Sequence, residues 1–226
     1  MRIAILGSIR PWCGASCRQR FRRYQRDIAR FIHAQMQDHY WVDNVEYEVH
    51  VRTGVTELKP SAYTCVAQQP PADYLVTPAD KSNMAKYVFG GFKRCLYSVQ
   101  KFQSDSERML AVILDRESIK WFKPAKGQFQ IVYCWSGDLP EYLPDFVAET
   151  ADAIYMLEPK ARNQMEDAEV LAKKEVAVLW CRRASDYAET CAGKPWTYVL
   201  IPHDEIAVNM TLAGLVGRFS VVGPIL

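Results

Sequence analysis

Residues 144–160 read PDFVAETADAIYMLEPK, two runs of β-forming residues separated by a turn signal at Ala151-Asp152. These runs predict a β-hairpin in which residues equally far from the turn face each other. Asp145 then lies directly opposite Glu158, with the two side chains on one face of the sheet. Lys160 is two residues beyond Glu158, so the strand period returns it to the same face. The hairpin therefore predicts that two carboxylates and an ammonium group meet at one end.

Opposed carboxylates destabilise a sheet unless something neutralises them, and a divalent cation with oxygen ligands does so. The sequence thus indicates a Mg²⁺ site at Asp145 and Glu158, where Mn²⁺ is a possible substitute. Lys160 is a candidate for orienting a water or for offsetting charge on phosphorus. Two alternatives stay open: the spacing arises by chance, or the register slips by one residue and disperses the cluster. Pro159 in addition indicates an edge position or a bulge.

A helix is expected before the hairpin, because Ser104 and Glu107 have the spacing of a capping box and an apolar run follows. Glu107 is a candidate further carboxylate, either in the surroundings of the metal or as a ligand to a second ion. An acid at a helix start also has a plain electrostatic explanation. Both interpretations of Glu107 remain open.

The order of elements predicts an α/β fold. Strands are expected over 119–122 and 129–134 before the hairpin. After it we expect a helix over 166–188, a strand over 196–201 and a helix over 205–219 with Asp204 as its N-cap. The buried side of the long helix is predicted to carry Val170, Val176, Ala177, Trp180 and Tyr187.

The first 30 residues are much more basic than the rest of the chain. Residues 1–30 contain eight arginines and one acid, giving a charge of +7 within a chain of net charge +2. Residues 1–100 are expected to form an accessory layer, with a basic amphipathic helix over 18–40 and a strand from Tyr47 to Val51, in front of a domain at 101–226. Four arginines recur at helical spacing, and together with one lysine they are either contacts to DNA phosphates or a solvated face: Arg22, Arg23, Arg26, Arg30 and Lys173.

Seven irregularly spaced cysteines indicate reduced thiols, and no apolar run is long enough for a membrane span. A soluble, cytoplasmic protein with no membrane partner is therefore expected.

The domain resembles a known family in an ordered series of blocks. The blocks cover 28–41 (IARFIHAQMQDHYW), 87–102 (YVFGGFKRCLYSVQKF), 104–133, 142–150 (YLPDFVAET), 155–188 and 193–206 (GKPWTYVLIPHDEI). They resemble the C-terminal nuclease region of the restriction (R) subunit of type III restriction enzymes, which belongs to the PD-(D/E)XK superfamily. The resemblance implies a restriction-endonuclease-like mixed sheet flanked by helices and a Mg²⁺-dependent site for cutting double-stranded DNA.

The family pattern maps onto Glu107, Asp145, Glu158 and Lys160 as catalytic residues, with Asp145, Glu158 and Glu107 as metal ligands. Pro159 departs from the usual residue of the motif. The restriction subunits also carry an ATP-driven helicase motor, whereas this chain contains no phosphate-binding loop and so no ATP site. A separately encoded motor and a modification (methyltransferase) subunit are therefore expected partners. The arginine-rich start suits either DNA contact or the new N-terminus of a truncated gene.

Two functional hypotheses follow. The first is a metal-dependent endonuclease. The second is a catalytically inactive remnant of a restriction subunit that binds DNA or docks to another subunit. A purely structural domain would leave the pairing of Asp145 with Glu158 unexplained.

Overall fold

The computed structural model describes residues 70–136 and 138–221, together with residues 27, 29–33, 35, 57 and 58. Within the basic segment, the described positions 27, 29–33 and 35 are helical, in agreement with the predicted helix. The strand predicted from Tyr47 to Val51 lies outside the described residues.

A mixed four-stranded sheet forms the centre of the domain. Its order is β4-β7-β8-β9, in which β4, β7 and β8 are antiparallel neighbours and β9 runs parallel to β8. The strands are β4 (Lys120–Phe122), β7 (Phe146–Glu149), β8 (Ile154–Lys160) and β9 (Trp196–Pro202). The α/β class expected from the sequence is confirmed.

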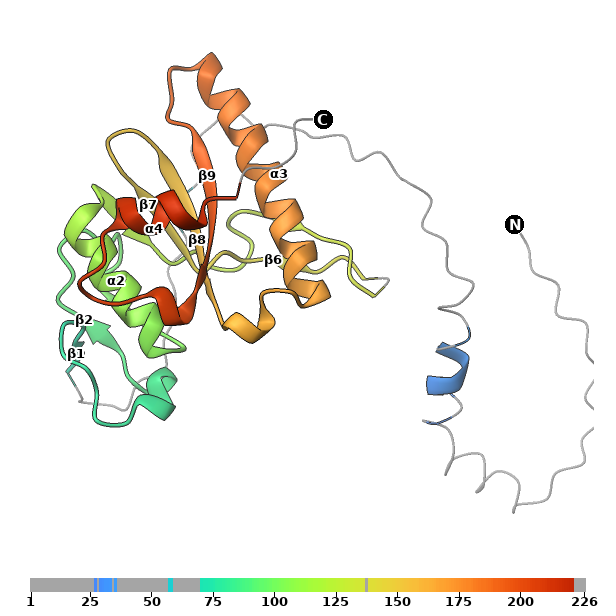
Figure 1. Cartoon of the computed structure of the whole chain (residues 1–226), viewed down its shortest axis with the longest axis horizontal. Coiled ribbons are helices and arrows are strands. Elements are labelled where there is room, and N and C mark those ends of the chain that lie inside the picture. The colour runs from blue at the N-terminus through green and yellow to red at the C-terminus, as the bar shows by residue number, and fades with distance from the viewer. Residues whose placement is uncertain are drawn as a thin grey trace, which may run out of the picture. The chain divides into compact units, whose positions relative to one another are not determined.

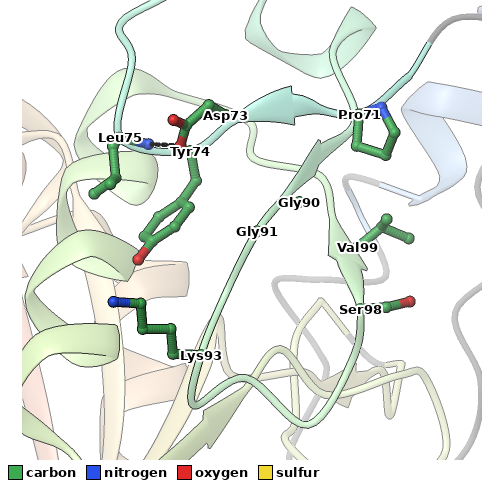
Figure 2. Close-up of a pocket in the computed structure, with 9 residues that line it drawn as sticks. All are labelled: Pro71, Asp73, Tyr74, Leu75, Gly90, Gly91, Lys93, Ser98 and Val99. Atoms are coloured by element: carbon green, nitrogen blue, oxygen red, sulfur yellow. Dashed lines mark hydrogen bonds between the residues drawn. The ribbon is translucent and has the colours of Figure 1, made fainter.

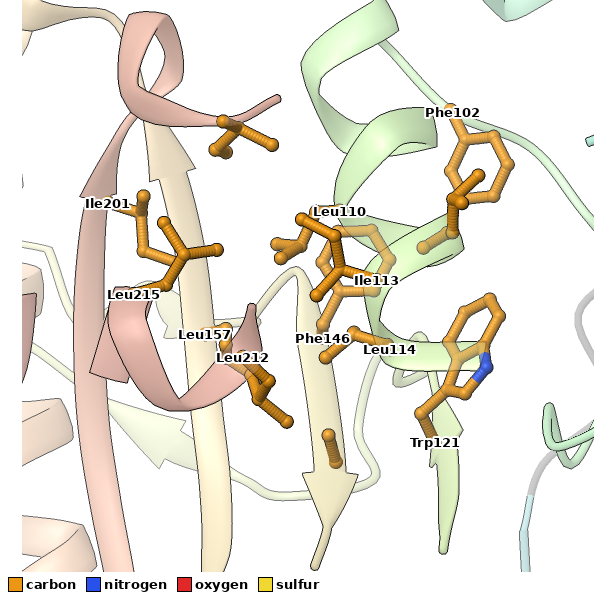
Figure 3. Close-up of a cluster of buried hydrophobic side chains, with 14 of the residues drawn as sticks. Phe102, Leu110, Ile113, Leu114, Trp121, Phe146, Leu157, Ile201, Leu212 and Leu215 are labelled. Atoms are coloured by element: carbon orange, nitrogen blue, oxygen red, sulfur yellow. The ribbon is translucent and has the colours of Figure 1, made fainter. Parts of the chain in front are cut away.

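Helices cover both faces of this sheet (Figure 1). Helix α3 (Ala168–Thr190) connects β8 to β9 across one face, which is why these two strands are parallel. Helices α2 (Asp105–Glu117) and α4 (Leu212–Phe219) pack on the other face. Figure 3 shows that core, in which the sheet residues Phe146, Leu157 and Ile201 meet Leu110 and Leu215 of the helices. Each fully buried side chain of this kind stabilises the fold by about 2 kcal/mol.

The α3 face has its own core, to which two further strands contribute. Met156, Tyr198 and Leu200 of the sheet pack against α3, and β5 (Ile131–Val132) and β6 (Glu141–Tyr142) form a separate two-stranded sheet beside them. The strand predicted over 129–134 therefore exists in part, but it does not join the main sheet. Among the described residues, β5 pairs with β6 alone, and the two strands together pack against α3.

The buried side of α3 differs from the prediction in the second half of the helix. Val170 and Ala177 are buried as expected, whereas Tyr187 is exposed. Cys181 and Ala188 are buried instead, because small side chains let the helix lie close to the sheet. Val176 and Trp180 are partly buried against this core.

The two predicted helix starts have different outcomes. Ser104 caps α2, because its Oγ accepts a hydrogen bond from the backbone N–H of Glu107 at 3.2 Å. The last helix, however, begins at Leu212 rather than at 205, and its cap is Thr211, whose Oγ1 accepts from Gly214 N at 3.1 Å. Asp204 was the wrong cap: it lies in the short 3₁₀ turn His203–Glu205 and accepts a hydrogen bond from Arg162 at 2.8 Å.

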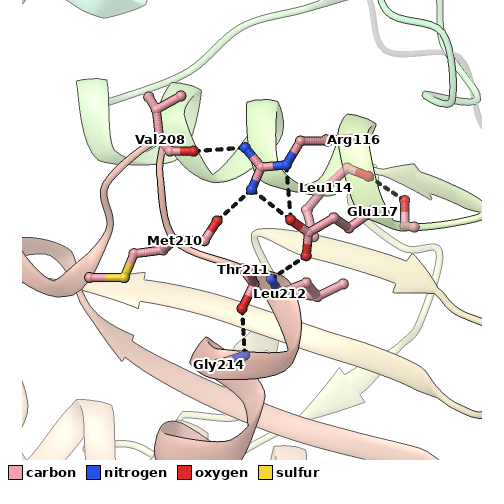
Figure 4. A network of polar contacts seen from close by, with 9 residues as sticks. Leu114, Arg116, Glu117, Val208, Met210, Thr211, Leu212 and Gly214 are labelled. Carbon is pink, nitrogen blue, oxygen red and sulfur yellow. Dashed lines mark hydrogen bonds and ion pairs between the residues drawn. The ribbon is translucent and has the colours of Figure 1, made fainter.

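A polar network attaches the loop before α4 to the end of α2 (Figure 4). The guanidinium of Arg116 donates to the carbonyl oxygen of Val208 at 2.8 Å and also to that of Met210. Glu117 Oε2 accepts from the backbone N–H of Leu212 at 2.6 Å, at the first residue of α4. These contacts fix the helix start at 212, which local sequence alone does not reveal.

Residues 70–100 pack against α2 rather than forming a separate layer. They contain a small sheet of β1 (Ala72–Asp73), β2 (Phe89–Gly90) and β3 (Val99–Gln100), and a 3₁₀ segment at Lys81–Lys86. Tyr74, Met84 and Phe89 belong to the same buried cluster as Leu110 and Phe146. Within the described residues, the predicted boundary between 100 and 101 therefore does not separate two cores. No helix among the described residues combines the length and apolar character needed to cross a bilayer.

Candidate active site

The hairpin has the register expected from the sequence. Phe146 pairs with Leu157 and Glu149 pairs with Ile154, and the turn closes where the backbone N–H of Thr150 donates to the carbonyl oxygen of Ala153 at 2.9 Å. Asp145 directly precedes Phe146 and Glu158 directly follows Leu157, so the two carboxylates lie next to the last pair of the ladder, at the same end of the hairpin. The predicted slip by one residue does not occur.

Pro159 lies within β8 without ending it. The strand pairs with β7 only as far as Leu157, but it pairs with β9 through Lys160, including the pair of Pro159 with Ile201. On the β7 side, Pro159 is therefore beyond the paired region, which is the kind of edge position where a missing N–H costs least. Lys160 remains on the strand, two residues from Glu158 and on the same face.

Glu158 is buried, with both carboxylate oxygens engaged. The hydroxyl of Tyr142 donates a hydrogen bond to Oε2, and the ammonium of Lys160 lies 3.1 Å from Oε1. Burial and the adjacent charge of Glu158 raise the pKa of Tyr142 well above its usual value, so this hydroxyl stays a proton donor. Tyr142 and Lys160 together fix the orientation of the Glu158 carboxylate.

Glu107 is also buried, and it pairs with a residue that the sequence analysis missed. Its Oε2 accepts a hydrogen bond from the backbone N–H of Gln103 at 3.1 Å and forms an ion pair with Lys123. Lys123 follows β4, two residues beyond the buried Trp121, so the strand period turns its side chain toward α2. The strand period could have predicted that Lys123 points toward α2, but no local feature of the sequence distinguishes it from the neighbouring Lys120 and Lys126.

Asp145 is half-buried and has a different environment. Within the described part of the chain its carboxylate makes no hydrogen bond and no ion pair. The pKa of Asp145 is raised to about 7, mainly by burial and in smaller part by the charges of Glu107 and Glu158, while Lys123 and Lys160 act in the opposite direction. The same charge interactions place Asp145 near all four groups. A carboxylate with a pKa near neutrality is typical of functional sites.

Of the predicted metal ligands, Asp145 is the most available to a metal ion, because Glu158 is engaged by Tyr142 and Lys160 and Glu107 by Lys123. Among the residues that the structure describes, no group of three or more His, Cys, Asp and Glu side chains is arranged to hold a metal. Mg²⁺ is, however, commonly bound by one or two carboxylates, with water and phosphate oxygens completing its shell. Asp145 and Glu158 supply such a pair, and Asp145 has no competing partner there. Glu107, the third predicted ligand, is held by Lys123, and Glu158 would have to share its carboxylate between the ion and Lys160.

The predicted DNA contacts are only partly described. Lys173 forms an ion pair with Glu169 at 2.7 Å and lies 5.4 Å from the centre of the Tyr133 ring. Arg30 is exposed and lies 4.0 Å from Asp27. Arg22, Arg23 and Arg26 lie outside the described residues.

A shallow pocket lies away from this cluster, in the segment before α2 (Figure 2). Tyr74, Gly90 and Lys93 line it together with residues of β1 and β3. None of the predicted site residues borders it, so the pocket and the carboxylate cluster are separate features.

Comparison of the chain with family models gave no match, and comparisons with curated proteins and with solved structures gave no significant match.

Proposed function

We propose that the domain containing residues 101–226 acts, together with residues 70–100 that share its core, as a metal-dependent endonuclease of the PD-(D/E)XK type, similar to the nuclease region of type III restriction subunits, which hydrolyses phosphodiester bonds in double-stranded DNA. The observation that carries the proposal is the hairpin register, which ends at the pair of Phe146 with Leu157 and so brings the adjoining Asp145 and Glu158 to one end of the hairpin, with Lys160 beside Glu158. In this proposal the protein works in the cytoplasm with a separately encoded motor and modification subunit. The restriction-endonuclease-like fold is part of the same proposal.

Asp145 and Glu158 would hold the ion, Mg²⁺ or in its place Mn²⁺. When bound, the ion polarises the phosphate and lowers the pKa of a coordinated water. Glu158 is oriented for this role by Tyr142. Asp145 is a ligand only when ionised, and because its pKa is about 7, proton competition weakens metal binding below neutral pH.

Lys160 supplies a fixed positive charge next to the ligands. Its side chain is 24% exposed and remains tied to Glu158, so the ammonium is accessible to a phosphate yet held in place. A preorganised cation of this kind stabilises negative charge that develops on the phosphate oxygens during hydrolysis.

The test is cleavage of supercoiled plasmid by the full chain with Mg²⁺, with Mn²⁺ and with EDTA. We expect metal-dependent nicking that Asp145→Asn and Lys160→Met each reduce by about 100-fold or more. Glu149→Gln is the matched control, because Glu149 is at the other end of β7 and pairs with Lys120 and Lys194. Cutting that persists in folded Asp145→Asn would overturn the proposal.

One observation favours the second candidate, an inactive DNA-binding or docking domain. Glu107 and Glu158 already have internal cationic partners in Lys123 and Lys160, as expected of a site that has become self-neutralised. If the folded protein binds duplex DNA but never cuts it with either ion, even beside a cognate motor, this candidate replaces the first.

A further inference from the structure

Lys123 occupies the space beside Glu107 as a built-in cation. Its side chain is 16% exposed, and its ammonium forms an ion pair with Glu107 Oε2, whose own side chain is 9% exposed. Lys123 directly follows β4 and Glu107 belongs to α2, so two packed elements of the fold hold the pair in place.

Two aromatic rings hold the same ammonium. Lys123 Nζ lies 4.6 Å from the ring centre of Phe146 and 5.8 Å from that of Phe102. A cation over aromatic faces is stabilised by the ring quadrupoles, and more strongly where water is excluded. Lys123 is also the charge with the largest effect on the pKa of Asp145, so its ammonium is held within electrostatic reach of that proposed metal ligand.

The charges in the cluster suit one divalent ion. When all are ionised, Glu107, Asp145 and Glu158 carry three negative charges against the two positive charges of Lys123 and Lys160, so one negative charge is left. One divalent ion and one phosphodiester group then bring the cluster to neutrality. A second divalent ion would leave two uncompensated positive charges in a poorly solvated place, which is costly.

We propose that Lys123 takes the place of a second metal ion beside Glu107, so that the site binds a single divalent cation at Asp145 and Glu158. This inference rests on the proposed function. Lys123 is thus a positioning residue, which fixes Glu107 and limits the number of ions.

The test measures Mn²⁺ binding to the full chain, by calorimetry and by electron paramagnetic resonance, without reference to cleavage. Wild-type protein is expected to bind one ion. Lys123→Met keeps the length and the apolar contacts of the side chain but frees Glu107, and is expected to tighten Mn²⁺ binding by about tenfold or more. Adding Glu107→Gln to Lys123→Met is expected to remove most of that gain. Lys123→Arg, which keeps the charge, is expected to bind like wild type.

Lys120→Met is the matched control, since Lys120 is on the same strand, pairs with Glu149 at 3.3 Å and is expected to leave Mn²⁺ binding unchanged. Two ions bound to wild type, or unchanged affinity in folded Lys123→Met, would overturn the inference and leave the nuclease proposal standing. No Mn²⁺ bound to wild type at millimolar concentration would overturn the metal-dependent function itself. Asp145→Asn separates the cases, because it is expected to abolish binding in every background.

Discussion

Asp115, near the end of α2, and Asp145, at the start of β7, are two aspartates of one domain with opposite surroundings. Asp115 is buried and accepts hydrogen bonds from four donors: the backbone N–H groups of Lys93 and Arg94, the hydroxyl of Tyr74 at 2.7 Å and the indole N–H of Trp121 at 3.0 Å. Burial by itself would raise its pKa, but these hydrogen bonds lower the pKa of Asp115 below its usual value. Asp145 has no such donors among the described residues, and burial raises its pKa to about 7.

The difference separates a carboxylate that stabilises the fold from one that costs stability. Two of the donors around Asp115, the Tyr74 hydroxyl and the Trp121 indole, belong to buried side chains that need an acceptor, and the donors from residues 74, 93 and 94 let the carboxylate join α2 to the segment before it. The ionised carboxylate of Asp145 receives no comparable hydrogen bonds from the described residues. Groups that destabilise the fold in this way are typical of sites retained for chemistry.

The largest effect is expected from Asp115→Ala. The substitution leaves buried donors without an acceptor, including Tyr74 and Trp121, and is expected to reduce the free energy of unfolding by about 3 to 5 kcal/mol. Urea denaturation followed by circular dichroism measures the loss. A loss under about 1 kcal/mol would mean that water replaces the carboxylate, and that the contrast with Asp145 is smaller than the geometry indicates.

Asp145→Asn is expected to increase the free energy of unfolding, whereas Asp115→Ala is expected to decrease it. Since folding raises the pKa of Asp145, ionising it costs stability, and this cost is absent below about pH 4 and complete above about pH 7. Asparagine resembles the protonated form, so the variant is expected to be more stable by about 2 kcal/mol at pH 8, which corresponds to a rise in Tm of about 4 to 8 °C.

The pH dependence provides the control for that prediction. The gain from Asp145→Asn is expected to shrink steadily as the pH falls from 8 toward 4, as measured by thermal unfolding in metal-free buffer. The pKa of Asp115 is lowered, so its contribution to stability is present throughout this range and is lost only at lower pH. A stability gain from Asp145→Asn that is independent of pH would show that the carboxylate is not held near neutrality.

A smaller loss is expected from Tyr142→Phe. Removing the hydroxyl takes away the donor to Oε2 of the buried Glu158, and Lys160 alone remains as its partner, so we expect a loss of about 2 kcal/mol. Tyr155→Phe is the comparison, because the Tyr155 hydroxyl makes no hydrogen bond within the described residues. Equal stability of the two variants would argue that Tyr142 does not hold Glu158.

The sequence predicts the site best where the information is local. The hairpin register that brings Asp145 and Glu158 to one end follows from a two-residue turn and the strand period, and the cap of α2 follows from Ser104 and Glu107 three residues apart. These features depend on residues close together in the chain. The structure therefore reproduces them almost residue by residue.

The features that sequence reasoning missed depend on contacts between distant residues. Lys123 matters because α2 brings Glu107 to it, 16 residues away in the chain. Helix α4 starts at Leu212 because Glu117, 95 residues earlier, accepts the hydrogen bond of its first N–H. Asp204 has good capping chemistry, but Arg162, in the short 3₁₀ turn Arg162–Gln164 between β8 and α3, engages it. Local propensity cannot anticipate a competing partner that only the tertiary fold supplies.

The smallest effect is expected from Tyr74→Phe, which removes one of the four donors to Asp115. Because three donors remain, the expected loss is only about 1 kcal/mol, half of that for Tyr142→Phe at the less fully satisfied Glu158. A double-mutant cycle with Asp115→Ala isolates the interaction: in that background Tyr74→Phe is expected to cost almost nothing, since the hydroxyl has already lost its acceptor. If Tyr74→Phe costs as much with Asp115 absent as with it present, the hydroxyl stabilises the fold through another contact. Tyr74 would then not be one of the donors that stabilise the ionised form of Asp115, and the contrast with Asp145 would rest on the remaining three.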